Sequence, residues 1–161
     1  MLRLIERLVP APLHRAALRL AHRTRHHWRR IVKPRLAGVS IIATNHAGEI
    51  LLVRHSYGPA NWALPGGGCG TAEDPAEAAR REMREELAVG LHDLTLVARI
   101  EEVISGAPHV AHVFACVLSD QPQPDRREIL EARFFARDAL PQPINRIAAV
   151  RLRHWMELEQ R

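Results

Sequence analysis

The chain has 161 residues, the size of one ordinary domain, and a formal net charge of +5. Its hydrophobic (47%) and charged (25%) fractions exclude a largely disordered chain, and no apolar run approaches the 18 residues of a membrane-spanning helix. Cys69 and Cys116 form no CxxC pair, so we expect neither a disulfide framework nor a zinc site. We expect the protein to be cytoplasmic, because this cysteine usage suits a reducing compartment.

The charge is unevenly distributed along the chain. Residues 1–35 hold ten Lys or Arg and one Glu, a net +9, whereas the other residues hold 13 basic and 17 acidic groups, a net −4. From Leu13 to Ile31, apolar residues recur at steps of three and four among the arginines. We therefore predict a basic amphipathic helical extension over residues 1–35. Its apolar stripe could pack on the body, pair with a second copy as a homodimer, or bind an anionic membrane surface peripherally. The basic arm could also bind nucleic acid, which is the less favoured partner.

The body begins with two apolar segments. Residues 36–44 and 49–54 are predicted strands, and the turn at 45–48 between them predicts a hairpin. A loop then leads through residues 62–64 into Pro65-Gly66-Gly67-Gly68, for which we expect irregular backbone.

A helix is predicted over residues 75–88. Asp74 has N-cap chemistry, Pro75 occupies the first helical position, and Glu77 is placed to reach back to the cap. We expect Gly90 to supply the left-handed residue that stops the helix.

The second half of the body alternates strands with one more helix. Residues 94–104, 109–118 and 131–136 are predicted strands, and the segment 109–118 is apolar on both faces, which favours a central position. An amphipathic helix is predicted over residues 144–159. Its predicted apolar stripe consists of Ile147, Val150, His154 and Leu158. Hairpin links among strands and helices predict an α/β domain with a mixed sheet and helices on its faces.

Three carboxylates share one face of the first predicted helix. At 100° per residue, Glu82, Glu85 and Glu86 lie within an arc of about 100°, beside the apolar strip. Such like charges repel each other, and a divalent cation such as Mg²⁺ or Mn²⁺ relieves the repulsion. The Gly67 backbone can approach the same ion and offer a carbonyl oxygen. This pattern indicates metal-assisted hydrolysis at phosphorus.

The spacing of these residues also resembles a known motif. Gly67, five residues, Glu73, seven residues and then Arg81-Glu82-Met83-Arg84-Glu85-Glu86-Leu87-Ala88-Val89 resemble the Nudix box, and the match covers residues 67–89. The preceding Trp62–Gly67 segment is also typical of the family. The resemblance implies a Nudix-like α/β/α sandwich over residues 36–161 that hydrolyses phosphoric anhydride bonds with Mg²⁺ or Mn²⁺.

The resemblance also implies roles for individual residues. Gly67, Glu82, Glu85 and Glu86 would bind the metal. Alternatively, Glu82 would orient or deprotonate the attacking water instead of binding the metal. Arg81 would hold the carboxylates in register, and Glu73 would brace Arg81. Ala88 replaces the usual Gly of the box, and we expect the turn to shift to Gly90.

Further residues are weaker candidates for substrate contact. Arg54 could touch phosphate, and Tyr57 and Trp62 could stack on a nucleobase, although Trp62 also suits the core. His112 could contact substrate or lie satisfied in the core. Glu128 could act as an additional base or support the ligands, because some members of the family use a downstream acid.

The predicted function is hydrolysis of a nucleoside diphosphate linked to another moiety. Two alternatives remain open. The first is a catalytically weak Nudix-fold sensor of a nucleotide metabolite, although all three box carboxylates are present. The second is a membrane-surface protein that acts through its basic arm.

Overall fold

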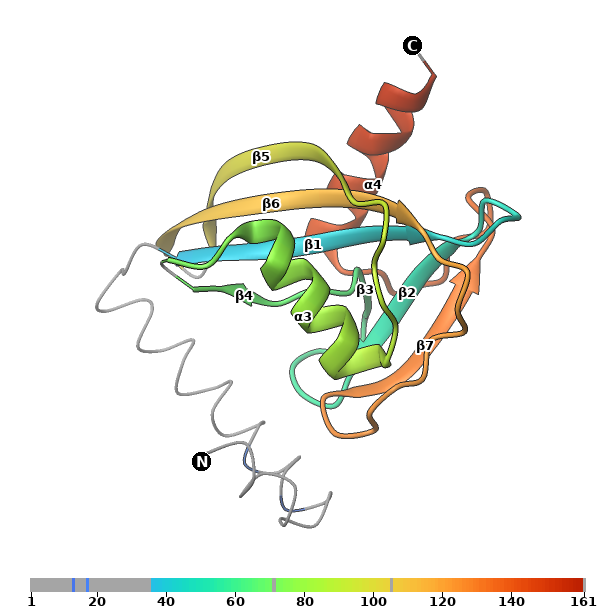
Figure 1. Ribbon diagram of the computed structural model, residues 1–161, viewed down its shortest axis with the longest axis horizontal. Helices are drawn as coiled ribbons and strands as arrows, with labels where there is room; N and C mark the ends of the chain where they lie inside the picture. Colours follow the sequence, from blue (N-terminus) through green and yellow to red (C-terminus); the bar gives the residue numbers. More distant parts are fainter. Residues whose placement is uncertain (1–12, 14–16, 18–35, 71, 105, 161) are drawn as a thin grey trace.

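The computed structural model describes residues 36–70, 72–104 and 106–160, together with Leu13 and Ala17 (Figure 1). Within these residues, seven strands form one sheet, and two helices accompany it. The strands are β1 (Leu36–Thr44), β2 (Ile50–His55), β3 (Trp62–Ala63), β4 (Gly68–Cys69), β5 (Thr95–Ile104), β6 (Ala107–Val117) and β7 (Ile129–Phe135). The helices are α3 (Pro75–Leu87) and α4 (Arg146–Glu159).

The sheet is mixed, as the sequence predicts. Its central order is β3-β2-β1-β6-β5, with β4 paired to β1 and β7 paired to β2. β1 and β6 run parallel, from Leu36 opposite His109 to Thr44 opposite Val117, and the other paired strands run antiparallel. β6 lies between β1 and β5, which confirms its predicted central position. Gly68 was expected in irregular backbone but pairs with Gly38 as part of β4.

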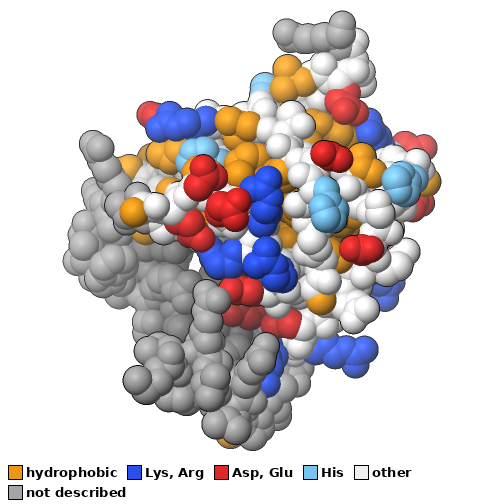
Figure 2. Space-filling view, viewed as in Figure 1, with side chains coloured by type: hydrophobic (Ala, Val, Ile, Leu, Met, Phe, Trp, Pro, Cys, Tyr) orange, Lys and Arg blue, Asp and Glu red, His pale blue; other side chains and the backbone are white. Residues whose placement is uncertain are grey.

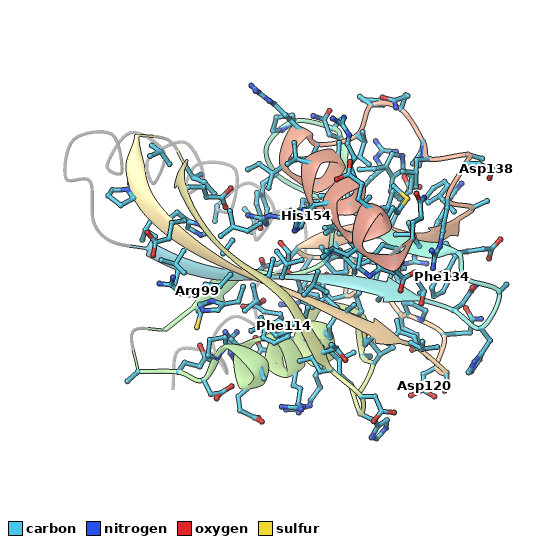
Figure 3. The ribbon with its side chains drawn as sticks, turned by 90° about the horizontal axis from the view of Figure 1, so that it is seen from above. Arg99, Phe114, Asp120, Phe134, Asp138 and His154 are labelled. Atoms are coloured by element: carbon cyan, nitrogen blue, oxygen red, sulfur yellow. The ribbon has the colours of Figure 1, made fainter. Side chains whose placement is uncertain are left out.

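The helices cover opposite faces of the sheet, so the domain is an α/β/α sandwich (Figure 3). Alternate residues of each strand point to opposite faces, and this divides the core into two clusters. Ile41 and Phe114 pack with Met83 of α3, whereas Ile42 packs with Leu152 of α4.

The two ends of α3 differ in how well the sequence predicts them. The Asp74 carboxylate accepts hydrogen bonds from the backbone N–H groups of Ala76 (2.7 Å) and Glu77 (3.3 Å), which confirms the N-cap. The Glu77 side chain instead accepts from Arg80 at 2.8 Å. The expected stop at Gly90 is wrong, because Ala88 itself takes the left-handed conformation, with φ of 57°. The chain must turn at once, since Val89 is buried in the core directly after the helix.

The predicted apolar stripe of α4 is wrong. Val150 is 54% exposed, Leu158 is 40% exposed, and His154 is also exposed. The buried residues of this helix are Ala148, Arg151, Leu152 and Trp155. The predicted stripe and the observed buried residues both fit a helical period, so periodicity alone does not select the buried face. The sheet selects it, because Trp155 and Leu152 pack into the cluster around Ile42, Ile50 and Leu52.

Most of the basic arm lies outside the described residues. Leu13, at 63% exposure, and Ala17 are both helical and exposed. No helix in the described part of the chain is long and apolar enough to cross a membrane.

Candidate active site

A glycine loop lies along β1 and faces the first helix. The backbone N–H of Val39 donates to the Gly67 carbonyl at 2.9 Å. Gly66 has a φ of +138°, and a Cβ there would lie 2.2 Å from the Val39 carbonyl oxygen. A Cβ on Gly67 would lie 2.5 Å from the carboxyl carbon of Glu82. The two glycines therefore allow the loop to fit between β1 and the acidic face of α3.

Arg81 ties this loop to the helix. Its Nε donates to Glu73 Oε1 at 2.8 Å, its Nη1 to Glu82 Oε1 at 2.7 Å, and its Nη2 to the Gly68 carbonyl at 3.0 Å. Glu85 Oε2 lies 3.6 Å from Nη1. The hydrogen bond with Glu73 is the largest cause that raises the pKa of Arg81. Acidic and basic side chains accordingly gather over the face that carries α3 (Figure 2).

Glu73 braces the other side of the loop. Its Oε2 accepts the backbone N–H of Gly70 at 2.9 Å, in addition to Arg81. The structure thus brings together Gly67, Glu73, Arg81, Glu82 and Glu85 as a connected group.

Glu86 is the buried acid of the site. It is 6% exposed, and its Oε2 has no hydrogen-bond partner among the described residues. Burial, and then the charges of Glu82, Glu128, Asp125 and Glu85, raise the pKa of Glu86 to about 9. Burial also raises the pKa of Glu82, and the Arg81 hydrogen bond opposes that shift. Clustered carboxylates with raised pKa values favour a bound cation.

The chemistry of these oxygen donors fits a divalent metal, but among the described residues the side chains do not form a complete metal-binding site. No group of three or more His, Cys, Asp or Glu side chains in the described part of the chain is arranged to hold a metal. Arg81 occupies one oxygen of Glu82. The unpartnered oxygen of Glu86 and the second lone pair of the Gly67 carbonyl are hard oxygen donors, which Mg²⁺ and Mn²⁺ prefer.

The connection between β6 and β7 brings Glu128 to this acid cluster. Glu128 and Asp125 are close enough for their charges to raise the pKa of Glu86. Sequence reasoning considered Glu128 but missed Asp125, whose carboxylate accepts backbone N–H groups of residues 127–129. An Asp that follows Pro124 shortly before a strand is a typical turn signal, and it could have been found from the sequence.

The weaker candidates Arg54, Tyr57 and Trp62 come from β2, β3 and the loop between these strands. Arg54 pairs with Glu131 at 2.8 Å, and its guanidinium lies 5.8 Å from the centre of the Trp62 ring. Trp62 is 8% exposed and packs edge-on against Phe135, so it belongs to the core rather than to an open stacking surface. The Tyr57 ring lies 5.2 Å from that of His55.

His112 lies on β6, opposite Val39 of β1 and Arg99 of β5. Its Nδ1 is buried without a hydrogen-bond partner in the described part of the chain. The structure shows no hydrogen bond or ion pair between His112 and the carboxylates of α3.

With this geometry in view, comparisons with known proteins place the chain in a family. A family model of the NUDIX domain matches residues 34–156. This chain belongs to the Nudix family. The matched residues include the whole box, from Gly67 to Val89.

Solved structures of the Nudix family share the fold. The MutT NUDIX hydrolase of Burkholderia pseudomallei is similar with a TM-score of 0.68 and 28% identity, covering 75% of this chain and 98% of that chain. A UDP-X diphosphatase is similar with a TM-score of 0.63 and 27% identity, covering 78% and 64% of the two chains.

Curated relatives match over a shorter stretch. The RNA pyrophosphohydrolase of Rhodospirillum rubrum is 41% identical over 54 residues, 34% of this chain and 33% of that protein. The RNA pyrophosphohydrolase of Cellvibrio japonicus is 38% identical over 60 residues, 37% of this chain and 35% of that protein. The chain thus spans about a third of the length of these relatives.

Proposed function

We propose that this Nudix hydrolase cleaves the pyrophosphate link of a nucleoside diphosphate joined to another moiety, with Mg²⁺ or Mn²⁺ as its cofactor. One observation carries the proposal. Glu86 is buried beside Glu82 and Glu128, with an unpartnered oxygen and a pKa raised to about 9, next to a glycine loop that leaves room for Glu82. Such an arrangement is costly without a cation, and it suits a cation that also contacts phosphate oxygens.

Gly67, Glu82, Glu85 and Glu86 would hold the metal, which when bound polarises a phosphoryl group and lowers the pKa of a coordinated water. Glu82 and Glu86 must lose their protons to act as ligands. Arg81 donates to Glu82 at 2.7 Å, which opposes the burial that raises the pKa of Glu82, and it lies 3.6 Å from Glu85.

Glu73 positions Arg81 rather than substrate. Its two oxygens accept from Arg81 and from the Gly70 backbone, so it joins the loop to α3. Glu128 is near enough to Glu86 for its charge to raise the pKa of Glu86, and it is suited to orient the attacking water.

The experiment is hydrolysis of a panel of nucleotide sugars, dinucleotides and nucleoside triphosphates with Mg²⁺ or Mn²⁺. Glu86→Gln should abolish turnover of the best substrate, and chelation of the metal should do the same. Glu77→Gln is the matched control, because Glu77 is an exposed acid of the same helix that pairs with Arg80. Binding of a panel member without turnover by the wild type would favour the sensor alternative.

A second class of substrate, RNA, should be included in the panel. The curated relatives are RNA pyrophosphohydrolases, and residues 1–35 carry a net +9 that would attract a polyanion. RNA with a 5′-triphosphate end should therefore be tested beside the small molecules. Release of pyrophosphate from RNA, with no turnover of the nucleotide sugars, would replace the first substrate class by the second.

The basic arm is proposed to act separately from the hydrolase. Removal of residues 1–35 should leave turnover of a small substrate intact and weaken binding to anionic vesicles or self-association. Unchanged vesicle binding and an unchanged oligomeric state after removal would contradict this role.

A further inference from the structure

The connection from β6 to β7 caps the C-terminal end of α3 (Figure 1). The backbone N–H of Gln123 donates to the Leu87 carbonyl at 2.7 Å, and that of Asp125 donates to the Glu86 carbonyl at 3.0 Å. The carbonyls of a last helical turn have no partner within their helix. The connection is therefore fixed to the same turn that carries Glu86.

The Asp125 carboxylate then organises the residues that follow it. Its Oδ1 accepts from the backbone N–H groups of Arg127 (3.0 Å), Glu128 (3.0 Å) and Ile129 (2.9 Å). Its Oδ2 accepts from the backbone N–H of Glu128 at 3.2 Å. Arg126 has a φ of 58°, and this left-handed residue lets consecutive N–H groups point at one oxygen.

Ser56 holds the same segment from the opposite side. This residue is 5% exposed and directly follows β2. Its Oγ donates to the Arg127 carbonyl at 2.6 Å, and its backbone N–H donates to the Glu128 carbonyl at 2.8 Å. The Glu128 N–H is thus bound by Asp125, and the Glu128 carbonyl is bound by Ser56. Because Asp125 is itself bound to the Glu86 carbonyl, these contacts fix the Glu128 backbone relative to Glu86.

We propose that Asp125 is a positioning residue of the reaction, which fixes the Glu128 backbone so that the Glu128 carboxylate is held beside Glu86. This rests on the proposed function. Asp125 acts through geometry and not through its charge, because a second carboxylate near Glu86 adds repulsion without touching the reacting atoms.

The variants separate geometry from charge. Asp125→Ala removes all four hydrogen bonds of the carboxylate and should lower kcat about 10- to 100-fold, with KM within about two-fold, because small misplacements at a catalytic group have effects of this size. Asp125→Asn keeps Oδ1 as an acceptor and should recover most of that loss. Asp125→Glu keeps the charge but moves the oxygens by one methylene, and it should be as impaired as the alanine variant.

The matched control is Asp120→Ala. Asp120 is an exposed acid of the same connection, labelled in Figure 3, and its removal should leave kcat unchanged. Circular dichroism and thermal melting check that each variant folds. If the alanine variant does not fold, the comparison of Asp125→Asn with Asp125→Glu tests the same point.

A double-mutant cycle with Glu128→Gln tests whether Asp125 affects kcat through Glu128. If Asp125 acts through Glu128, the double variant Asp125→Ala/Glu128→Gln should have the kcat of Glu128→Gln alone. Losses that multiply in the double variant would overturn the proposal. So would an alanine variant that melts at a lower temperature but retains the wild-type kcat, and either result would leave the proposed function intact. Absence of metal-dependent turnover in the wild type would overturn the proposed function, and the role of Asp125 with it.

Discussion

The burial of Glu86 should make the stability of the metal-free protein depend on pH. Glu86 is 6% exposed, and its pKa is raised from 4.5 to about 9. A carboxyl whose folded-state pKa is raised contributes full stability below its unfolded pKa and loses it as pH rises through the folded pKa. The window for this group runs from about pH 4.5 to about pH 9.

The magnitude follows from the width of this window. Each pH unit inside it lowers the free energy of unfolding by about 1.4 kcal/mol, because the unfolded state has already released the proton that the folded state retains. Between pH 5 and pH 8 this amounts to about 4 kcal/mol for the wild type. Glu86→Gln has the same shape and cannot ionise, so it should not show this loss.

The assay is urea unfolding in chelator at several pH values between 5 and 8. Fluorescence of the buried Trp62 and Trp155 reports the transition. Glu77→Gln, at an exposed position of the same helix, should follow the wild type. The reasoning is refuted if the stability difference between wild type and Glu86→Gln does not change with pH. Addition of Mg²⁺ should flatten the dependence in the wild type and in Glu77→Gln, because a bound cation favours the ionised Glu86 carboxylate.

Three further substitutions test other contacts. Gly67→Ala places a Cβ 2.5 Å from the Glu82 carboxyl carbon and should lower kcat by about 100-fold with the fold retained by circular dichroism; wild-type turnover would contradict this. Ala88→Gly relieves a left-handed residue (φ 57°) and should raise the free energy of unfolding by about 1 kcal/mol; a lower urea midpoint would contradict this. Arg151→Met leaves the partly buried Glu102 without its guanidinium and should cost about 2–3 kcal/mol in urea unfolding. Adding Glu102→Gln should restore part of that loss, and a further loss would count against the ion pair.

Much of the site is local in sequence and could therefore be predicted. Gly67, Glu73, Arg81 and Glu82 lie within one loop and one helix, and the structure joins them by direct contacts. Helix geometry alone places Glu82 and Glu86 on one face. The N-cap at Asp74 is equally local, because its partners are the next residues of the chain.

The positions that local patterns left open or misplaced depend on how distant parts of the chain pack. Trp62 could have stacked on a ligand, but Phe135 and the α4 cluster bury it. The apolar stripe of α4 was ambiguous, since two stripes fit one helical period, and the shape of the cluster around Ile42 selects one of them. Gly90 was a reasonable helix stop, yet the burial of Val89 requires the turn to occur at Ala88.

The sequence by itself determined the box, the two helices of the body, its five longer strands and the metal-assisted chemistry at phosphorus that we propose. These follow from spacing, periodicity and residue chemistry, which act over a few residues. Only the tertiary structure decided how deeply Glu86 is buried and which distant acids face it. Asp125 and Glu128 reach Glu86 because the connection between β6 and β7 binds the end of α3 and Ser56 at once. Such contacts depend on how the sheet and helices pack, and no local pattern encodes that packing.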